Sequence, residues 1–148
     1  MATTDAEARF VDTNVLVYAN QFGSAHHAAA TVLLRQTEVA GAALWISGQV
    51  LREYLAAVTR SQGAVAALPM SVALERVRFF AQRFWLIEDG PEIRAQLLTL
   101  LTAYPVAGKQ VHDANIVATM LANGVTRLLT FNVADFRRFD GLITIEGP

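Results

Sequence analysis

Hydrophobic and polar residues follow two patterns along the chain, and each pattern predicts a different element. Five short runs are rich in β-branched, aromatic and aliphatic residues and are bounded by polar residues or glycine, which is typical of buried strands. The longer stretches between them repeat apolar residues at helical spacing. Strands are expected at Arg9–Asp12, Leu44–Ser47, Trp85–Glu88, Arg127–Phe131 and Leu142–Ile145. Helices are expected at Val15–Asn20, Ser24–Val39, Gln49–Ser61, Ser71–Arg83, Pro91–Tyr104 and His112–Asn123.

Glycine positions support these boundaries. Gly41, Gly63, Gly108 and Gly124 each follow a helical stretch, where a residue with positive φ commonly ends a helix. Pro91 suits the first turn of the helix that it opens. Because strands alternate with helices, the pattern predicts an α/β fold in which helices cover both faces of a mainly parallel sheet.

Length and composition limit the class of protein to which this chain can belong. At 148 residues the chain fits a single domain, residues 1–148, with residues 1–8 expected to form a flexible N-terminus. Those residues lack the basic start and apolar middle of a secretory signal, so we expect a cytoplasmic protein. No apolar stretch reaches the roughly 20 residues that a membrane span needs. The absence of cysteine excludes a disulfide framework and thiolate ligands, so any metal must be held by oxygen or imidazole.

The first predicted strand ends in an unexpected carboxylate. In RFVDTNVLVYAN, residues 9–20, an apolar run leads directly into Asp12, and apolar residues resume at Val15. Burying an ionised carboxylate without a partner is costly, so Asp12 is expected to be either a helix cap or a ligand. Asn132 and Asp135 follow the fourth predicted strand. Ligands of open α/β sheets bind beyond the carboxyl ends of the strands, so these side chains should share one edge of the sheet.

Two further carboxylates lie toward the inner sides of predicted helices. Glu53 stands three residues after Val50 and next to Tyr54, and so borders an apolar stripe. Asp113 stands four residues before Val117, on the inward side of the first turn of its helix. The helix dipole favours an anion there by only about 0.3–1 kcal/mol, which is too little to offset burial of a charge.

Each carboxylate also has an ordinary structural explanation. Asp12 and Asp113 could each cap a helix. Glu53 could pair with Arg52 or Arg60 on a solvated surface. The segment NVADF could be one more turn. Capping does not predict, however, that four separate segments bring oxygen atoms to the same edge of a sheet, whereas a metal site does.

Four segments resemble, in order, the motifs of PIN-domain ribonucleases, in particular the VapC toxins of bacterial toxin–antitoxin pairs. The segments are FVDTNVLVYA, the Glu53 helix, HDANIVATM and LLTFNVADF, and together they span nearly the whole chain. The resemblance implies a PIN-like three-layer α/β/α fold and an endoribonuclease whose acidic residues bind Mg²⁺ or Mn²⁺. One departure concerns Asn132, because many relatives have Asp at that place. Asp135 is then the only carboxylate of the last motif.

The chemistry of such a nuclease explains these residue types. Two carboxylates about 4 Å apart repel by about 4 kcal/mol at an effective dielectric constant of about 20, and a divalent cation relieves this repulsion. Oxygen ligands suit Mg²⁺ or Mn²⁺ better than Zn²⁺, and such a metal can generate hydroxide from water. With the resemblance, we expect Asp12 and Asp113 to be direct ligands. Glu53 is expected to act through water or as a base, and Asp135 as an outer ligand. Hydrogen bonds from four neighbours should hold the ligands or water: Thr13, Asn14, Thr130 and Asn132.

The expected partners are an RNA substrate, an antitoxin and a second copy of the chain. The formal net charge is only −1, so RNA contacts should be local. Basic residues around the proposed edge are candidates for phosphate binding: Lys109, Arg127, Arg137 and Arg138. The resemblance adds an antitoxin that blocks the acidic site, often with a basic side chain. Apolar stripes on the helices at Ser24–Val39 and Ser71–Arg83 indicate a homodimer. Four aromatic residues read as core or subunit contacts: Phe79, Phe80, Phe84 and Trp85.

Other functions remain open at this level. A haloacid-dehalogenase-type phosphatase also begins with an Asp after its first strand, but it needs a second Asp two positions later, where this chain has Asn14. A PIN fold that only binds a partner is a further alternative, and the presence of Asp12, Glu53 and Asp113 argues against it. The three histidines are less informative: His26 and His27 are expected to be solvated, and His112 to flank its helix.

Overall fold

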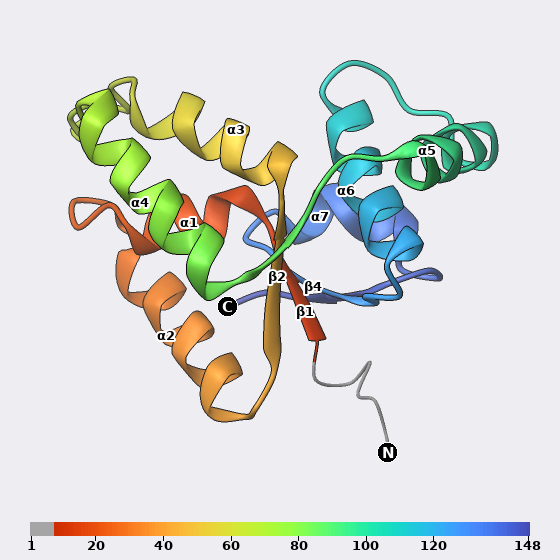
Figure 1. The fold of residues 1–148 in the computed structure, drawn as a ribbon, viewed down its shortest axis with the longest axis horizontal. Coiled ribbons are helices and arrows are strands. Elements are labelled where there is room, and N and C mark those ends of the chain that lie inside the picture. The colour runs from red at the N-terminus through yellow and green to blue at the C-terminus, as the bar shows by residue number, and fades with distance from the viewer. Residues whose placement is uncertain (1–7) are drawn as a thin grey trace.

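The computed structural model describes residues 8–148, which form a five-stranded sheet with helices on both sides (Figure 1). The strands are β1 (Ala8–Val11), β2 (Ala43–Ser47), β3 (Trp85–Ile87), β4 (Arg127–Leu129) and β5 (Thr144–Glu146). The helices are α1 (Thr13–Ala19), α2 (His27–Val39), α3 (Gly48–Val58), α4 (Met70–Arg83), α5 (Pro91–Ala103), α6 (Gln110–Ala122) and α7 (Val133–Phe136), and a 3-10 turn, η1 (Arg137–Phe139), follows α7. A flexible N-terminus was predicted at residues 1–8. Residues 1–7 lie outside the described residues, and Ala8 is the first residue of β1.

The sheet has the strand order β3-β2-β1-β4-β5, and all of its pairings are parallel. In the central strand β1, Phe10 pairs with Trp45 on one side and with Leu128 on the other. Helices α1 to α4 lie on one side of the sheet and α5 to α7 on the other (Figure 1). The predicted three-layer α/β/α architecture is therefore confirmed, and the sheet is parallel throughout the described residues.

The core lies where the middle strands meet the helices. Phe10 and Val11 of β1 and Leu128 and Leu129 of β4 have no exposed surface. In each strand two consecutive residues are buried, so both faces of the strand are covered, which is typical of parallel strands. Because both ends of β1 are fixed by its two neighbours, the residue that follows Val11 has a well-defined position.

Two glycines show why the predicted helix ends are reliable. Gly41 follows α2 with φ +87°, and Gly124 follows α6 with φ +68°. A residue with a Cβ atom adopts these angles only with strain, whereas glycine does so freely. The Gly41 N–H donates to the carbonyl oxygen of Glu38 and the Gly124 N–H to that of Leu121, so both glycines close the last turn of their helix.

Several boundaries differ from the prediction. Helix α1 begins directly after Asp12, at Thr13, because the aspartate itself ends the strand and caps the helix. Helix α2 begins three residues later than expected, since the hydroxyl of Ser24 accepts a hydrogen bond from the His26 N–H and holds a turn there. Strand β5 is shifted to Thr144–Glu146, where it pairs with β4.

The segment after β4 contains an element that the sequence pattern did not predict. Helix α7 and the turn η1 together contain two fully buried aromatic side chains, Phe136 and Phe139. Their spacing of three residues suits one turn of helix, but a segment this short gives no periodic signal. No helix within residues 8–148 has the length and apolar character needed to cross a membrane.

Candidate active site

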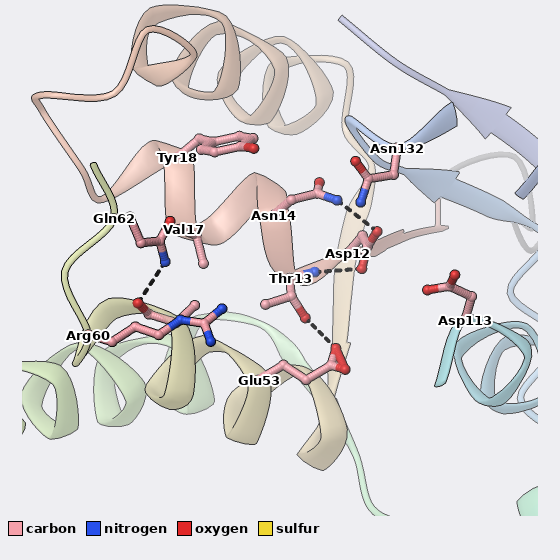
Figure 2. A pocket seen from close by; sticks show the side chains of 11 residues that line it. Asp12, Thr13, Asn14, Val17, Tyr18, Glu53, Arg60, Gln62, Asp113 and Asn132 are labelled. Atoms are coloured by element: carbon pink, nitrogen blue, oxygen red, sulfur yellow. Dashed lines mark hydrogen bonds between the residues drawn. The ribbon is translucent and has the colours of Figure 1, made fainter. Parts of the chain in front are cut away.

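A pocket lies beyond the carboxyl ends of β1 and β4, where α1, α3 and α6 approach one another (Figure 2). Its volume is about 260 Å³. Three carboxylates reach it from three separate segments: Asp12 at the end of β1, Glu53 on α3 and Asp113 on α6. The full lining comprises Asp12, Thr13, Asn14, Val17, Tyr18, Glu53, Ala57, Arg60, Gln62, Asp113 and Asn132. The tertiary structure thus brings together most of the polar residues that the sequence singled out.

Asp12 is the most deeply placed of these carboxylates, with 5% of its surface exposed. Its Oδ1 atom accepts a hydrogen bond from the Thr13 N–H at 2.8 Å. Its Oδ2 atom accepts from Asn14 Nδ2 at 3.0 Å and from the Thr130 hydroxyl at 2.8 Å. Asp12 therefore caps α1 and also lines the pocket, so the two explanations offered by the sequence are compatible.

The residues around Asp12 also form hydrogen bonds with one another. Thr130 is fully buried, and its hydroxyl oxygen also accepts from the Asn132 N–H at 2.9 Å. Asn14 Oδ1 accepts from the Phe131 N–H at 2.9 Å. These bonds join the start of α1 to the chain that leaves β4, across more than 100 residues of sequence. They also employ both ends of the Asn14 amide, which replaces the second aspartate that a haloacid-dehalogenase-type phosphatase would need.

Glu53 is half-buried and points toward α1. Its Oε1 atom accepts from the Thr13 hydroxyl at 2.9 Å and its Oε2 atom from Gln49 Nε2 at 3.3 Å. Arg52 instead pairs with Asp89 at 3.4 Å on the exposed surface. Within residues 8–148 Glu53 forms no ion pair, so the explanation as a surface pair with Arg52 or Arg60 is wrong.

A glutamine that the sequence analysis missed connects the two acidic helices. Gln49 is 5% exposed, and its Nε2 atom donates to the backbone carbonyl of His112 at 2.9 Å. Its Oε1 atom accepts from Asn115 Nδ2 at 2.7 Å. Since the same amide donates to Glu53, Gln49 fixes α3 against the first turn of α6, next to Asp113. Its position four residues before Glu53 on one helix face is the only signal that the sequence contains.

Burial and mutual repulsion disfavour the charged forms of two carboxylates. Burial raises the pKa of Asp12 from 3.8 to about 6, against the hydrogen bonds from Thr130 and Thr13, and the charges of Glu53 and Asp113 raise it further. Partial burial also raises the pKa of Asp113 to about 6, and the charges of Asp135 and Glu53 add to this effect. Asp135 is exposed and does not line the pocket, yet it is close enough to act on Asp113.

The oxygen atoms of the pocket are suitable ligands for a hydrated divalent cation. No group of three or more Asp, Glu or His side chains within residues 8–148 is close enough to hold an ion by itself. Mg²⁺ commonly uses only one or two protein carboxylates and completes its shell with water and substrate phosphate oxygens. The buried carboxylate of Asp12 and the partly buried carboxylate of Asp113 repel each other and supply such oxygens, and neither forms an ion pair within the described residues. The residues present therefore fit a hydrated Mg²⁺ or Mn²⁺ ion.

The basic residues proposed for phosphate binding are not all at this edge. Arg138 lies near Asp113, whose pKa its charge lowers, and its guanidinium donates to Gln110 Oε1 at 3.3 Å. Lys109 and Arg137 are exposed around the same helix ends. The placement of Arg127 here is wrong, because this residue begins β4 at the opposite end of the strand and pairs with Glu146 at 3.0 Å.

The histidines and aromatic residues agree with the predictions only in part. His27 is half-buried, with its Nδ1 atom 3.0 Å from the Tyr18 carbonyl oxygen, whereas His26 is exposed. Phe80 and Phe84 belong to the core as predicted. Tyr18, Arg60 and Gln62 line the pocket although the sequence analysis gave them no role there. Tyr18 lies near the end of α1, and Arg60 and Gln62 follow the end of α3, so a pattern along one helix cannot reveal that they line one pocket.

Comparison with known proteins identifies relatives of this fold. A model of the PIN domain family matches residues 9–142. The solved structure of VapBC2 from Rickettsia felis, bound to a DNA fragment from its promoter, has a TM-score of 0.68 and 21% identity, covering 95% of this chain and 98% of that one. VapC20 from Mycobacterium tuberculosis, a sarcin-ricin loop cleaving toxin, has a TM-score of 0.62 and 21% identity, covering 81% and 86%. A toxin–antitoxin complex from Klebsiella pneumoniae has a TM-score of 0.65 and 22% identity, covering 92% and 96%. The comparison with curated protein sequences gives no match.

Proposed function

The chain belongs to the PIN domain family, and from this premise we propose that it is a metal-dependent endoribonuclease that serves as the toxin of a toxin–antitoxin pair. The observation that carries the proposal is the convergence of Asp12, Glu53 and Asp113 on one pocket. Helix capping and surface ion pairs do not account for this convergence. Two of the three carboxylates have raised pKa values, and perturbed pKa values are common among the residues of functional sites.

The residues of the pocket suit a bound Mg²⁺ ion. Asp12 and Asp113 would hold it directly, with Glu53 and Asp135 acting through water. When bound, the ion supplies charge neutralisation for a phosphodiester and lowers the pKa of water. Mn²⁺ prefers the same oxygen ligands and would serve as well.

The protein groups have separate tasks in this proposal. Three hydrogen bonds hold the Asp12 carboxylate in one orientation. The donors are the Thr13 N–H, the Asn14 amide and the Thr130 hydroxyl. The Glu53 carboxylate, which accepts hydrogen bonds from Thr13 and Gln49, would accept a proton from the attacking water. Asn132 lines the pocket where many relatives have an acid, so it is suited to hold water by hydrogen bonds rather than to bind the ion.

The direct test is cleavage of a labelled RNA by the purified chain, with Mg²⁺ and with EDTA. We expect cleavage only with the metal, and we expect Asp113→Ala to abolish it, because that carboxylate is a proposed ligand. The matched control is Asp140→Asn, an exposed carboxylate outside the pocket. Cleavage that continues in a folded Asp113→Ala protein would move the chemistry elsewhere.

The proposed partners are an RNA substrate and an antitoxin, in the cytoplasm. Solved structures of the same fold include the toxin–antitoxin complex from Klebsiella pneumoniae, VapBC from Salmonella typhimurium bound to DNA and FitAB bound to a DNA fragment. An acidic pocket attracts a basic side chain of such a partner electrostatically. The chain and the product of the adjacent gene should therefore purify as one complex. Separate elution of the two proteins at micromolar concentration would contradict this expectation.

A second copy of the chain is the proposed cover for an exposed apolar surface. Val39 at the end of α2 is 82% exposed, Phe79 on α4 is 55% exposed and Trp85 on β3 is 62% exposed. The ion pair between Glu38 and Arg83, 2.7 Å long, places the ends of α2 and α4 side by side. These three apolar side chains therefore lie on neighbouring elements, where a two-fold contact would cover them together.

Light scattering of the purified chain tests this assembly. The proposal gives the mass of a dimer for the wild type and of a monomer for Phe79→Asp. Leu98→Asp on α5, which alters a side chain that is 61% exposed on another helix, should leave the dimer intact. A monomeric wild-type protein would refute the homodimer.

A further inference from the structure

The carboxylates of the pocket come from different layers of the fold. Asp12 follows the central strand, Glu53 lies on α3 in one helix layer, and Asp113 lies on α6 in the helix layer on the other side of the sheet (Figure 1). A site built from both layers works only if α3 and α6 keep a fixed distance from each other beyond the edge of the sheet. That distance needs a physical cause.

The Asp113 side chain does not secure its own position. Within residues 8–148 its carboxylate forms no hydrogen bond and no ion pair, whereas Asp12 and Glu53 each accept hydrogen bonds on both oxygens. Lys109, the N-cap of α6, contributes no side-chain hydrogen bond to the start of the helix. The place of the Asp113 carboxylate therefore depends on the backbone of the first turn of α6.

Gln49 is the side chain that fixes this turn. It lies in the first turn of α3, where the Ser47 hydroxyl caps the helix by accepting from the Val50 N–H at 3.3 Å. The Gln49 side chain crosses to α6, where its Nε2 atom donates to the His112 carbonyl at 2.9 Å and its Oε1 atom accepts from Asn115 Nδ2 at 2.7 Å. In the described part of the chain, no other side-chain hydrogen bond joins these two helices.

The Gln49 amide fits its surroundings in one orientation. Its nitrogen faces two acceptors, the Glu53 carboxylate and the His112 carbonyl, and its oxygen faces the donor Asn115. A reversed amide would turn its oxygen toward the Glu53 carboxylate and leave the Asn115 donor without an acceptor. Gln49 is 5% exposed, and such mismatches are costly in a buried place. The same amide therefore holds Glu53 in one layer and the start of α6 in the other.

From this arrangement we propose that Gln49 is a positioning residue of the metal site: its amide joins the two helix layers and so sets the distance between the carboxylates of Glu53 and Asp113. The inference rests on the proposed function, because it takes these carboxylates as groups that hold the ion directly or through water. Gln49 does not line the pocket, so it acts through its neighbours. Replacement of residues that orient metal ligands commonly lowers metal affinity by about 10- to 100-fold.

A purely structural role for Gln49 leads to a different expectation. A buried amide that only ties two helices together stabilises the fold, and its loss lowers the free energy of unfolding. The ion would then bind to the folded molecules as tightly as before. A positioning residue, in contrast, changes the affinity of the folded protein for the ion, so affinity and stability have to be measured side by side.

The test uses metal binding without RNA, so that it does not depend on cleavage. Binding of Mn²⁺ to the full chain is measured from the electron paramagnetic resonance signal of the free ion, and stability is measured by urea denaturation in EDTA. Gln49→Met keeps the length of the side chain but removes both polar atoms. We expect this variant to bind Mn²⁺ about 10- to 100-fold more weakly than wild type.

Asn115→Ala is a milder second variant, which keeps Gln49 but removes the donor that orients its amide. We expect Mn²⁺ binding to weaken about two- to tenfold, which corresponds to one hydrogen bond. Because Asn115 acts through Gln49, the double variant should bind no more weakly than Gln49→Met alone. Losses that add in the double variant would contradict the proposed role. Asn115→Ala also decides the matter if Gln49→Met does not fold.

The matched control is Ile93→Val, which removes a buried methylene group from α5, outside the pocket. It should lower stability but leave Mn²⁺ affinity unchanged. Wild-type affinity in folded Gln49→Met or in Asn115→Ala would overturn the inference, and so would an equal loss of affinity in Ile93→Val. A wild-type protein that binds no Mn²⁺ would refute both this inference and the proposed function. Binding that depends on Gln49 in a protein that does not cut RNA would refute only the proposed function.

Discussion

Replacement of Asp12 by asparagine is predicted to remove the loss of stability that ionisation of this carboxylate causes as the pH rises. The carboxylate is 5% exposed and has a pKa of about 6 in the folded protein, against an ordinary value of 3.8. The folded state therefore binds a proton more tightly than the unfolded state. Stability from this group is full below about pH 4 and is lost as the pH rises toward 6.

The magnitude follows from the size of this shift. A difference of about two pKa units corresponds to about 3 kcal/mol at about 1.36 kcal/mol per unit, so ionised Asp12 destabilises the metal-free protein by about that amount at neutral pH. Linkage places about 2 kcal/mol of this loss between about pH 4.5 and 7.5. Asparagine at this position cannot ionise, so the variant keeps only the part of the pH dependence that belongs to other groups, Asp113 among them.

Hydrogen bonds set the absolute stability of the variant. Both oxygens of Asp12 accept from donors, namely the Thr13 N–H on one side and Asn14 and Thr130 on the other. An asparagine amide group must turn its own NH₂ toward one of these donors, which costs about 1–3 kcal/mol. At neutral pH this cost nearly offsets the gain from removing the charge, whereas at pH 4.5 only about 1 kcal/mol of that gain is present.

Urea denaturation in EDTA, followed by circular dichroism at pH 4.5 and 7.5, measures these quantities. The free energy of unfolding of Asp12→Asn relative to wild type should rise by about 2 kcal/mol between the two pH values. The exposed variant Asp140→Asn should show no such change relative to wild type. A constant difference between Asp12→Asn and wild type across this range would show that Asp12 is not a buried, destabilised carboxylate.

Three further predictions concern the same pocket. Mg²⁺ should raise the melting temperature of the wild type but not of Asp12→Asn, and an equal rise in both, measured by differential scanning fluorimetry, would contradict the assignment of this ligand. Thr130→Val should lower the free energy of unfolding by about 1–3 kcal/mol in urea denaturation, because the Asn132 N–H loses its acceptor. The variant should also raise the pKa of Asp12 further, because Asp12 loses the hydrogen bond from the hydroxyl. A pH dependence of stability no steeper than that of wild type would be evidence against this role of Thr130. Gln49→Leu should likewise cost about 1–3 kcal/mol and reduce RNA cleavage, since it removes the link between α3 and α6; full activity in this variant would show that the link is dispensable.

The sequence by itself determined the order of the elements and the edge of the sheet at which the acids gather. Alternating strand and helix patterns predicted a parallel sheet, and parallel strands place all of their carboxyl ends on one side. Asp12 and Asp113 could be located in this way because each stands next to a recognisable strand or helix end. The same rule also shows why Arg127 does not belong there, since it begins its strand rather than ends it.

Only the tertiary structure decided which side chains meet across elements. Gln49 contacts His112 and Asn115 on another helix, and Thr13 at the start of α1 donates to Glu53 on α3. A hydrophobic pattern reports which face of one helix is buried, but it does not contain the rotation or spacing of the helix opposite. Those quantities are fixed by the packing of side chains from distant parts of the chain, and so the partners of a polar residue at such a boundary appear only when the chain is folded.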